Sequence, residues 1–518
     1  MSEAAQLLSF DAFITHWARE APTRVALCEG ENSLTFAELE TYTAKIIGAL
    51  IAAGVVRGDR IIWIGKNSDL YFSLFYGAAR AGIVIAPVGW RLSTAEMAYI
   101  IGDTGAKFIF AGPGFEDVAR AVATELPSVE RVFSADETRD WINAAAPAAF
   151  TPATADEAVL QLYTSGTTGK PKGAVLSNRN LFGLRVPTLD AGLPWSQWDE
   201  DEVVMVAMPC AHIGGTGLGV MALAAGVAGH ILPDFTPDAV LDAVEKGGVT
   251  RFFMVPAALQ MVINSPRATL TDFSRLKYIF YGAAPIPLEL LRQCIAVFGA
   301  DFVQAYGMTE TTGTIVSLWP EDHDPAGNQR MRGQGRALPG VELKIVDEDG
   351  NTLPPHNVGE LMTRSSNNML TYWNLPDATA SAVTTDGWLK TGDAAYLDED
   401  GFLYIHDRMK DMIITGGENV YPAEVESAIY GHPAVAEVAV IGIPDDKWGE
   451  AVKAVCVAKP GMSIDEADII AWTRAKIAAF KVPKSIDVIA MLPRNASGKI
   501  LRKDLRAPYW KGRERMVN

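Results

Sequence analysis

The chain has 518 residues, of which 49% are apolar and 21% charged, and its formal net charge is −17. This length predicts more than one domain, and the composition is typical of a soluble globular protein. The acidic balance argues against a nucleic-acid-binding protein, which would carry a basic patch. The four cysteines (Cys28, Cys210, Cys294 and Cys456) are far apart and form no CxxC pair. This spacing argues against zinc and disulfides and favours a reducing, cytoplasmic location.

The sequence contains no segment that resembles a targeting signal or a membrane span. No basic patch followed by an apolar run comes after Met1, so no secretory signal is expected. The most apolar stretch, residues 214–232, is rich in glycine and is interrupted by His230. We expect a buried helix there rather than a transmembrane one, and peripheral contact with a membrane stays open.

Short β-type runs alternate with helical patterns through most of the chain. Residues 60–65 predict a strand, residues 69–80 a helix and residues 83–87 the next strand, and Ser93 with Glu96 forms a capping box that opens another helix. Further strands are expected at 203–209, 251–256, 278–283 and 301–307. The alternation predicts an α/β fold with doubly wound sheets, in which ligands bind beyond the carboxyl ends of the strands.

The pattern changes from about residue 341. Alternating strands at 341–350 and 401–406, punctuated by Asp-Gly turns, predict a β-rich subdomain that closes the large domain. A small α+β unit follows, with helices at 423–430 and 465–480 and strands at 436–443 and 452–458. We therefore predict a large N-terminal domain, residues 1–409, and a small C-terminal domain, residues 410–518, with the boundary at Lys410.

Residues 163–173, YTSGTTGKPKG, are the most informative segment of the chain. They combine three glycines, four hydroxyl side chains and two lysines. Backbone N–H groups with small hydroxyl side chains cradle phosphate oxygens, and a lysine adds positive charge. The loop of GTPases needs four residues between its glycines, whereas two separate Gly166 from Gly169, and Pro171 opposes a following helix. The segment predicts a polyphosphate grip for ATP; a plain flexible loop is the alternative.

Five further segments complete a set that resembles a known family. They are YGAAP (281–285), QAYGMTE (304–310), WLKTGD (388–393), RMKDMIITGGENVYP (408–422) and PRNASGK (493–499). In this order and spacing the set resembles the adenylate-forming enzymes, which include acyl-CoA synthetases, firefly-type luciferases and peptide-synthetase adenylation domains. The resemblance covers residues 8–506. It implies that a carboxylate reacts with ATP to give an acyl-adenylate and pyrophosphate, and that the acyl group then passes to a thiol, usually that of coenzyme A.

The resemblance also implies roles at the nucleotide. The phosphate grip would be formed by Thr164, Ser165, Gly166, Thr167, Thr168 and Lys172. Glu310 and Thr168 would bind Mg²⁺, and Thr309 would bind phosphate. The adenine and acyl pockets would be lined by Gly282, Ala283, Ala284, Gln304, Ala305, Tyr306 and Gly307. Asp393 would hold the ribose, and Arg408 would reach the ribose or a phosphate. Taken alone, Glu310 could be an ordinary helix-start acid, Tyr306 a core aromatic, and Asp393 or Arg408 part of a surface ion pair.

The C-terminal domain would serve two half-reactions. Lys499 resembles the lysine that neutralises charge at the reacting carboxylate and α-phosphate. Rotation about Lys410 would then bring Gly416 and Gly417 to a channel for the pantetheine arm of coenzyme A. Further coenzyme A contacts implied by the resemblance are Arg91, Trp448, Phe480 and Lys484, and for these four a structural role is an equal alternative.

The acyl pocket is expected around His212, which aligns with a pocket-mouth residue and for which we expect a steric rather than an acid–base role. Ile213, Gly217 and residues 311–313 would shape the same cavity. The sequence TTGT (311–314) lacks the proline typical of plant coumarate ligases. The abundant glycine suggests a roomy apolar pocket for a medium- or long-chain fatty acid, or for a bulky alkanoic acid that bears an aryl group or another ring.

The sequence therefore predicts an ATP- and Mg²⁺-dependent carboxylic acid–CoA ligase. Two alternatives stay open: an adenylate-forming enzyme with an acceptor other than coenzyme A, and a non-catalytic acyl or nucleotide sensor on the same scaffold. The expected partners are small molecules, with no nucleic acid and no integral membrane segment, and a homodimer is expected by analogy only.

Overall fold

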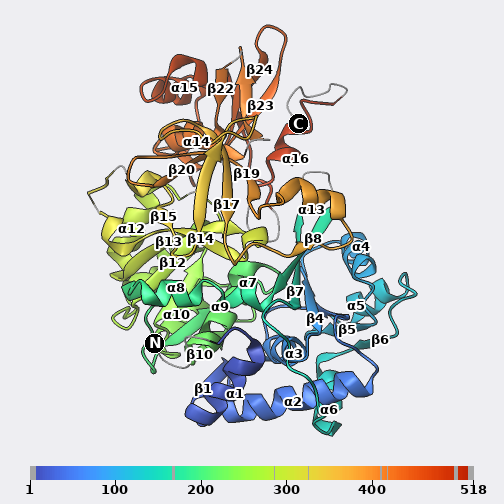
Figure 1. The fold of residues 1–518 in the computed structure, drawn as a ribbon. Coiled ribbons are helices and arrows are strands. Elements are labelled where there is room, and N and C mark those ends of the chain that lie inside the picture. Colours follow the sequence, from blue (N-terminus) through green and yellow to red (C-terminus); the bar gives the residue numbers. More distant parts are fainter. Residues whose placement is uncertain are drawn as a thin grey trace.

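The computed structural model describes residues 7–165, 170–284, 286–324, 326–328, 330–408, 411–416, 418–494 and 500–511, with the backbone alone for residues 165, 407, 408 and 419. Two large mixed sheets and a β-rich layer form the body of the molecule. The C-terminal α+β unit sits above them, next to β17, β19 and β20 (Figure 1). The predicted α/β class with a small C-terminal unit is confirmed.

The first large sheet carries the phosphate-loop hairpin, and its strand order is β18-β8-β7-β4-β3-β5-β6. The strands are β3 (Arg60–Ile64), β4 (Val84–Val88), β5 (Phe108–Ala111), β6 (Arg131–Phe133), β7 (Ala158–Ser165), β8 (Pro171–Ser177) and β18 (Thr371–Tyr372). Strands β3 to β7 run parallel, and β8 returns antiparallel to β7. The predicted ATP grip therefore begins at the carboxyl end of a parallel strand.

The second large sheet has the order β15-β14-β13-β12-β11-β9-β10-β1-β2. Its strands are β1 (Val25–Glu29), β2 (Asn32–Thr35), β9 (Val203–Val206), β10 (Ala228–Ile231), β11 (Arg251–Met254), β12 (Tyr278–Gly282), β13 (Asp301–Met308), β14 (Gly313–Leu318) and β15 (Arg336–Ala337). Its centre is parallel, whereas β2, β14 and β15 pair antiparallel at the two edges. The turns after β12 and β13 lie at the carboxyl ends of neighbouring strands, as predicted.

Helices cover both sheets. Those of the large domain are α1 (Phe10–Glu20), α2 (Phe36–Ala52), α3 (Asp69–Arg80), α4 (Thr94–Thr104), α5 (Glu116–Ala123), α6 (Ala135–Ala144), α7 (Asn178–Phe182), α8 (Arg185–Asp190), α9 (Ile213–Ala225), α10 (Pro237–Glu245), α11 (Pro256–Ile263), α12 (Leu288–Phe298) and α13 (Pro376–Ala382). The predicted helix at residues 69–80 and the predicted capping box of Ser93 and Glu96 are both confirmed. Ser93 Oγ accepts a hydrogen bond from the Glu96 amide, and the Glu96 carboxylate accepts one from the Ser93 amide.

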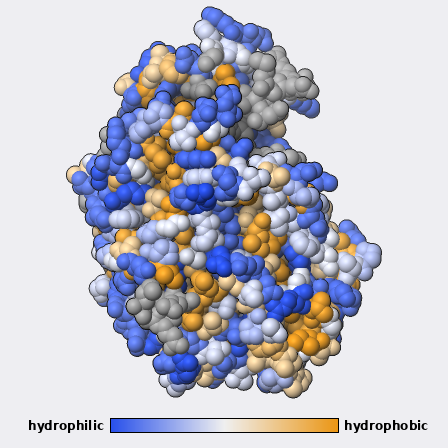
Figure 2. Space-filling model, in the orientation of Figure 1, coloured by the Kyte–Doolittle hydropathy of each residue, from blue (hydrophilic) through white to orange (hydrophobic). Residues whose placement is uncertain are grey.

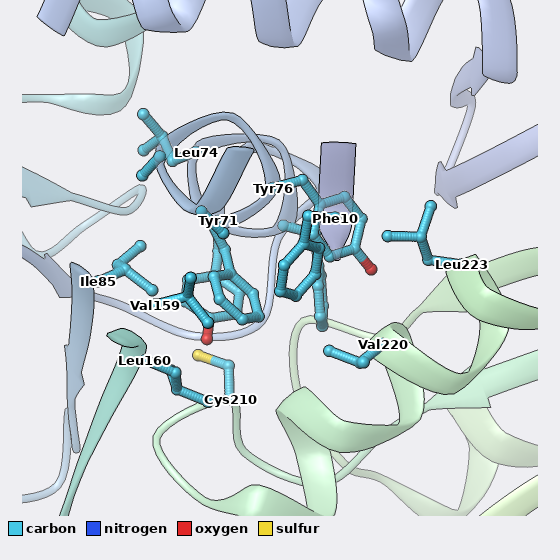
Figure 3. Packing of buried hydrophobic residues seen from close by; sticks show 14 of the residues in the cluster. Phe10, Tyr71, Leu74, Tyr76, Ile85, Val159, Leu160, Cys210, Val220 and Leu223 are labelled. Atoms are coloured by element: carbon cyan, nitrogen blue, oxygen red, sulfur yellow. The ribbon is translucent and has the colours of Figure 1, made fainter. Parts of the chain in front are cut away.

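Helix α3 lies in the core that the two sheets share. Every residue of α3 is buried, as expected for a helix that is apolar on all sides. Figure 3 shows Tyr71 and Tyr76 of this helix packed among Phe10, Leu160, Cys210 and Val220, which come from four other segments. Gly219 of α9 permits this packing, because a Cβ there would lie 2.2 Å from the Phe72 ring. The core thus holds α9, which packs on the second sheet, against α3.

The β-rich layer and the C-terminal unit complete the fold. The layer is the antiparallel sheet β16 (Glu342–Val346), β17 (Gly359–Arg364), β19 (Leu389–Leu397) and β20 (Leu403–Arg408). The C-terminal unit contains β21 (Ile413–Thr415), β22 (Glu418–Val420), α14 (Pro422–Tyr430), β23 (Val435–Asp445), β24 (Gly449–Ala458), α15 (Glu466–Arg474), β25 (Ser485–Val488) and α16 (Arg502–Arg506). Lys410 lies outside the described residues, so the boundary at this position stays a prediction.

Two expected helices differ from the structure. Residues 214–232 form α9 followed by β10, because Gly226 adopts a left-handed conformation that ends the helix. The helix expected over 465–480 ends at Arg474, and residues 479–481 form a separate short 3₁₀ turn. After α9 the apolar residues continue because β10 is buried in the sheet, whereas the residues that follow α15 are mostly exposed.

The visible surface mixes polar and apolar residues. In Figure 2 the hydrophilic residues cover much of both the body and the C-terminal unit, with apolar residues in patches between them. Among the described residues, no helix is long and apolar enough to cross a membrane.

Candidate active site

The structure brings Thr164, Lys172 and Glu310 together around one aromatic side chain. Glu310 lies in the 3₁₀ turn after β13, and its Oε1 accepts hydrogen bonds from Thr164 Oγ1 at 3.3 Å and from the Tyr372 hydroxyl at 2.7 Å. The Lys172 ammonium lies 5.0 Å from the centre of the Tyr372 ring, within range of a cation–π contact. Thr164 and Lys172 are opposite each other in the β7–β8 hairpin. The strand ends that flank the phosphate loop are thereby joined to the turn that carries Glu310.

The free oxygen of Glu310 suits a hard cation. Glu310 is 6% exposed, and its Oε2 accepts no hydrogen bond from the described residues. Within those residues, no cluster of three or more histidines, cysteines and acids could hold a metal by itself. Mg²⁺ typically takes one or two carboxylates and completes its shell with water and phosphate oxygens. A single poised carboxylate beside a polyphosphate grip therefore fits Mg²⁺ bound together with ATP.

Tyr306 and Asp393 form a second joined pair. The Tyr306 hydroxyl, on β13, donates to Asp393 Oδ2 at 2.5 Å. Asp393 is 4% exposed and lies on β19, where its amide donates a hydrogen bond to the Thr391 hydroxyl. Asp393 is thus buried and does not lie at the surface, and the Tyr306 side chain has a polar partner. In the ladder between β19 and β20 the backbone of Arg408 is directly opposite Asp393.

Close backbone packing explains two of the predicted glycines. A Cβ on Gly282 would lie 1.9 Å from the carbonyl oxygen of Ala305, its register partner on β13. A Cβ on Gly307 would lie 1.8 Å from the carbonyl oxygen of Gly313. Ala283, which follows β12, has φ 62°, an uncommon left-handed value for alanine. Small residues at these positions let the strand ends approach each other.

The remaining residues of this edge are also in place. Ala284 follows Ala283, and Gln304, which is 7% exposed, lies on β13. Thr309 opens the 3₁₀ turn, next to Glu310. The residues predicted to line the adenine and acyl pockets therefore lie on two adjacent strand ends.

His212 marks the start of α9, beside the turn after β13. It is the N-terminal cap residue of α9, and its Nε2 is buried without a hydrogen-bond partner in the described chain. Burial, together with the nearby Arg91 guanidinium, lowers the pKa of His212 to about 4. The imidazole is therefore neutral near pH 7, which fits the expectation that its role is not acid–base chemistry.

The other expected pocket residues lie around the same helix end. A Cβ on Gly313 would lie 3.5 Å from Ile213 Cγ1, so the helix start and this turn are in contact. Gly217 is one turn further along α9. The Thr311 hydroxyl accepts the Met308 amide at 2.9 Å, which holds the turn closed, and Thr312 has φ 53°. His212, Ile213 and residues 311–313 are thus neighbours, as predicted.

The coenzyme A candidates fall into two places. Arg91 lies on the large domain, where its guanidinium is 3.7 Å from Asp234 and stacks on Trp90. Trp448, Phe480 and Lys484 lie on the C-terminal unit, where Trp448 is 44% and Phe480 38% exposed. The Gly416 amide donates to the Trp448 carbonyl at 2.8 Å. The Gly416 turn and one exposed aromatic are therefore adjacent.

Several predicted residues lie outside the described residues, and their roles stay predictions. They are Gly166, Thr167, Thr168, Lys410, Gly417 and Lys499. The side chains of Ser165 and Arg408 are likewise not described. Tyr372, by contrast, was not predicted. It lies in a two-residue strand, and a lone aromatic in so short an element gives no recognisable signal in the sequence.

Comparisons with known proteins show the family of the chain. The AMP-binding enzyme family matches residues 14–373, and the AMP-binding enzyme C-terminal domain matches residues 424–499. The chain is 39% identical over 507 residues to the fatty acid–[acyl-carrier-protein] ligase ScoC of Streptomyces coeruleorubidus, covering 97% of this chain and 96% of that protein. It is 37% identical over 499 residues to a feruloyl-CoA synthase of Amycolatopsis sp, covering 95% and 97%.

A solved structure extends the likeness to the whole fold. ATP-bound MatB from Rhodopseudomonas palustris superposes with a TM-score of 0.87 at 32% identity, covering 97% of this chain and 99% of that one. The family match over residues 14–373 includes the hairpin, the Glu310 turn and Tyr306. The fold, the site and these relatives together place the chain in the AMP-binding enzyme family, as an adenylate-forming acid–thiol ligase.

Proposed function

We propose that this chain is an ATP- and Mg²⁺-dependent carboxylic acid–CoA ligase. The observation that carries the proposal is the convergence of Thr164, Lys172 and Glu310 at the mouth of the phosphate hairpin. A hydroxyl, an ammonium and a carboxylate arranged in this way support the binding of a triphosphate and its metal at this hairpin. In the first half-reaction a carboxylate oxygen attacks the α-phosphate of ATP, the bond to the β-phosphate breaks, and pyrophosphate leaves. In the second, a thiol takes the acyl group and AMP leaves.

Each side chain of the site has a separate role in the adenylation step. Lys172 and the hairpin backbone hold the phosphates, and the buried Asp393 accepts the two ribose hydroxyls, with the Tyr306 hydroxyl fixing its carboxylate. Mg²⁺, held by Glu310 and Thr168, would supply charge neutralisation between phosphate oxygens. Lys499 supplies the cation at the reacting carboxylate. A preorganised donor of this kind contributes about 2.7–4 kcal/mol to the transition state.

The proposed substrate is a medium- or long-chain fatty acid or a bulky alkanoic acid with an aryl group or another ring. A neutral His212 at the pocket gives no positive charge with which to pair a second carboxylate. The relatives named for fatty acid and for feruloyl-CoA support a monocarboxylate with a large apolar part.

The proposed acceptor is coenzyme A, and a carrier protein is the alternative. One relative is named for an acyl-carrier protein and another for a CoA thioester, so the comparisons leave both acceptors open. The exposed Trp448 beside the Gly416 turn offers a surface for the pantetheine arm or the adenine of coenzyme A. Free cysteines favour the cytoplasm, and a homodimer follows by analogy only.

Exchange of labelled pyrophosphate into ATP, measured with and without added acids, tests the first half-reaction. We expect exchange that depends on an apolar acid; nucleotide binding without exchange for any acid would favour the sensor alternative. Release of AMP with coenzyme A, compared with a purified carrier protein, then identifies the acceptor.

The role of Lys499 has a sharper test. Lys499→Ala should slow adenylation by about 10²–10³, while supplied acyl-adenylate is still converted to thioester. Lys503→Ala, an exposed lysine of α16, is the matched control. Equal losses in both half-reactions would contradict the assignment. Gly417→Leu should show the opposite selectivity, because a side chain would obstruct the thiol channel.

A further inference from the structure

Tyr372 lies between two groups that the proposed function needs. Its hydroxyl donates to Glu310 Oε1 at 2.7 Å in a buried setting, and its ring faces the Lys172 ammonium at 5.0 Å. Tyr372 itself is 8% exposed. One side chain thus contacts both the carboxylate expected to bind metal and the lysine expected to bind phosphate.

The backbone around Tyr372 is tied to both sides of the site. Tyr372 and Thr371 form β18, which pairs with Ala174 and Val175 of β8, the strand that carries Lys172. Three residues earlier, the Met369 amide donates to the Glu310 carbonyl at 2.8 Å. The segment therefore holds the hairpin and the Glu310 turn at a fixed separation.

A third contact fixes the far end of the same segment. The Trp373 indole donates to the Asp103 carbonyl at 2.9 Å, and the Trp373 amide donates to the Gly173 carbonyl at 2.7 Å. Asp103 also accepts the Tyr163 hydroxyl at 2.6 Å. With its neighbours bound to the hairpin and to α4, Tyr372 has little freedom to leave Glu310.

The hydrogen bonds to Glu310 also decide which oxygen is available. Thr164 and Tyr372 both donate to Oε1, and Oε2 accepts no hydrogen bond from the described residues. A carboxylate with one oxygen held by two donors presents the other in a single orientation. A hard cation binds more tightly to an oxygen that is already oriented, because less freedom is lost on binding.

We propose that Tyr372 is a positioning residue of the adenylation site. Its hydroxyl orients the Glu310 carboxylate toward the metal, and its ring holds the Lys172 ammonium in position for the phosphates by a cation–π contact. The inference rests on the proposed function, in which Glu310 binds Mg²⁺ and Lys172 binds ATP. It assigns the two parts of one side chain to two separable tasks.

Tyr372→Phe tests the hydroxyl, because it removes the hydrogen bond and keeps the ring. The probe is Mn²⁺, whose binding to the complex of the enzyme with a non-hydrolysable ATP analogue is measured by electron paramagnetic resonance. A hydrogen bond to a charged group corresponds to about a tenfold change in affinity. We expect Mn²⁺ to bind about tenfold more weakly, and the metal-free nucleotide analogue to bind as in the wild type.

Tyr372→Leu tests the ring. It should weaken the metal-free nucleotide analogue as well, by about threefold to tenfold, because the Lys172 ammonium loses its aromatic seat. A role in folding alone would not divide the two affinities in this way between the two variants.

Tyr509→Phe is the matched control, since the Tyr509 hydroxyl also donates to a carboxylate, that of Asp487 on the C-terminal unit. It should change neither affinity. Thermal unfolding of each variant shows that the fold is retained.

Binding measurements distinguish a failure of the proposed function from a failure of the role of Tyr372. A wild-type protein that binds neither the ATP analogue nor Mn²⁺ with it would contradict the proposed function. A Tyr372→Phe variant that folds and binds Mn²⁺ as tightly as the wild type would overturn this inference alone.

Discussion

A single methyl group on Gly282 should disable the nucleotide site. Gly282 ends β12 beside Ala305 of β13, and a Cβ on Gly282 would lie 1.9 Å from the Ala305 carbonyl oxygen. Real Cβ atoms essentially never come within 3.0 Å of such an atom, so one strand end must move by about 1 Å. The obstacle is backbone, which cannot swing aside as a flexible side chain would.

This displacement gives the expected magnitudes for Gly282→Ala. Overpacking of this kind costs about 1–3 kcal/mol of unfolding free energy. A misplacement of about 1 Å in a site can cost about 10²-fold in rate. Tyr306 lies on β13, one residue beyond Ala305, so the shift moves the Tyr306–Asp393 pair directly. We therefore expect acid-dependent pyrophosphate exchange to fall about 10²-fold in a protein that still folds.

Gly229→Ala is the matched control in the same sheet. Gly229 lies on β10, and a Cβ there would lie 3.4 Å from Leu27 Cδ2, an ordinary contact. Both variants are compared by pyrophosphate exchange and by urea unfolding. Exchange by Gly282→Ala within about threefold of the control would contradict this expectation, because the strand ends would then tolerate a shift of about 1 Å.

Three further predictions concern other parts of the molecule. The pKa of His212 is about 4 in the native state, against 6.5 ordinarily, so as pH drops the unfolded state binds a proton before the native state does. The free energy of unfolding should therefore fall as pH drops from about 6.5 to about 4. Urea unfolding at several pH values should show a weaker dependence of this free energy on pH for His212→Gln, and an unchanged dependence would contradict the assignment. Arg251→Met leaves the buried Glu202 carboxylate without its main partner and should cost about 3–5 kcal/mol of unfolding free energy, with partial recovery when Glu202→Gln is added; a loss below about 1 kcal/mol would count against a buried pair. Trp448→Ala should raise the KM for coenzyme A and leave the KM for ATP unchanged, since Trp448 is exposed beside Gly416; parallel changes in both constants would remove it from the acceptor site.

Short sequence patterns were sufficient to predict features that depend on residues only a few positions apart in the chain. The capping box of Ser93 and Glu96 and the bounds of helix 69–80 follow from short-range hydrogen bonds and apolar periodicity, and both are confirmed. The phosphate loop could be located because glycine, hydroxyl and lysine side chains had to be adjacent in the chain. The adenylate-forming family followed from six such segments in a fixed order.

Signals that depend on distant segments were missed. Residues 214–232 are mostly apolar on both sides of Gly226, yet Gly226 divides them into a helix and a strand, and β10 is buried between β9 and β1. Tyr372 gave no signal for a similar reason, since its partners Lys172 and Glu310 are about 200 and 62 residues away in the chain.

The amino-acid sequence alone determined the alternation of strands and helices, the phosphate loop and the family, because each depends on residues that are near one another in the chain. The tertiary structure decided which side chains act as one site. It joined Thr164 to Glu310 and Tyr306 to Asp393 across strand ends. It also placed Tyr372 between Glu310 and Lys172. Such contacts arise only when the sheets pack, because the directions in which buried side chains point are fixed by neighbours from elsewhere in the chain.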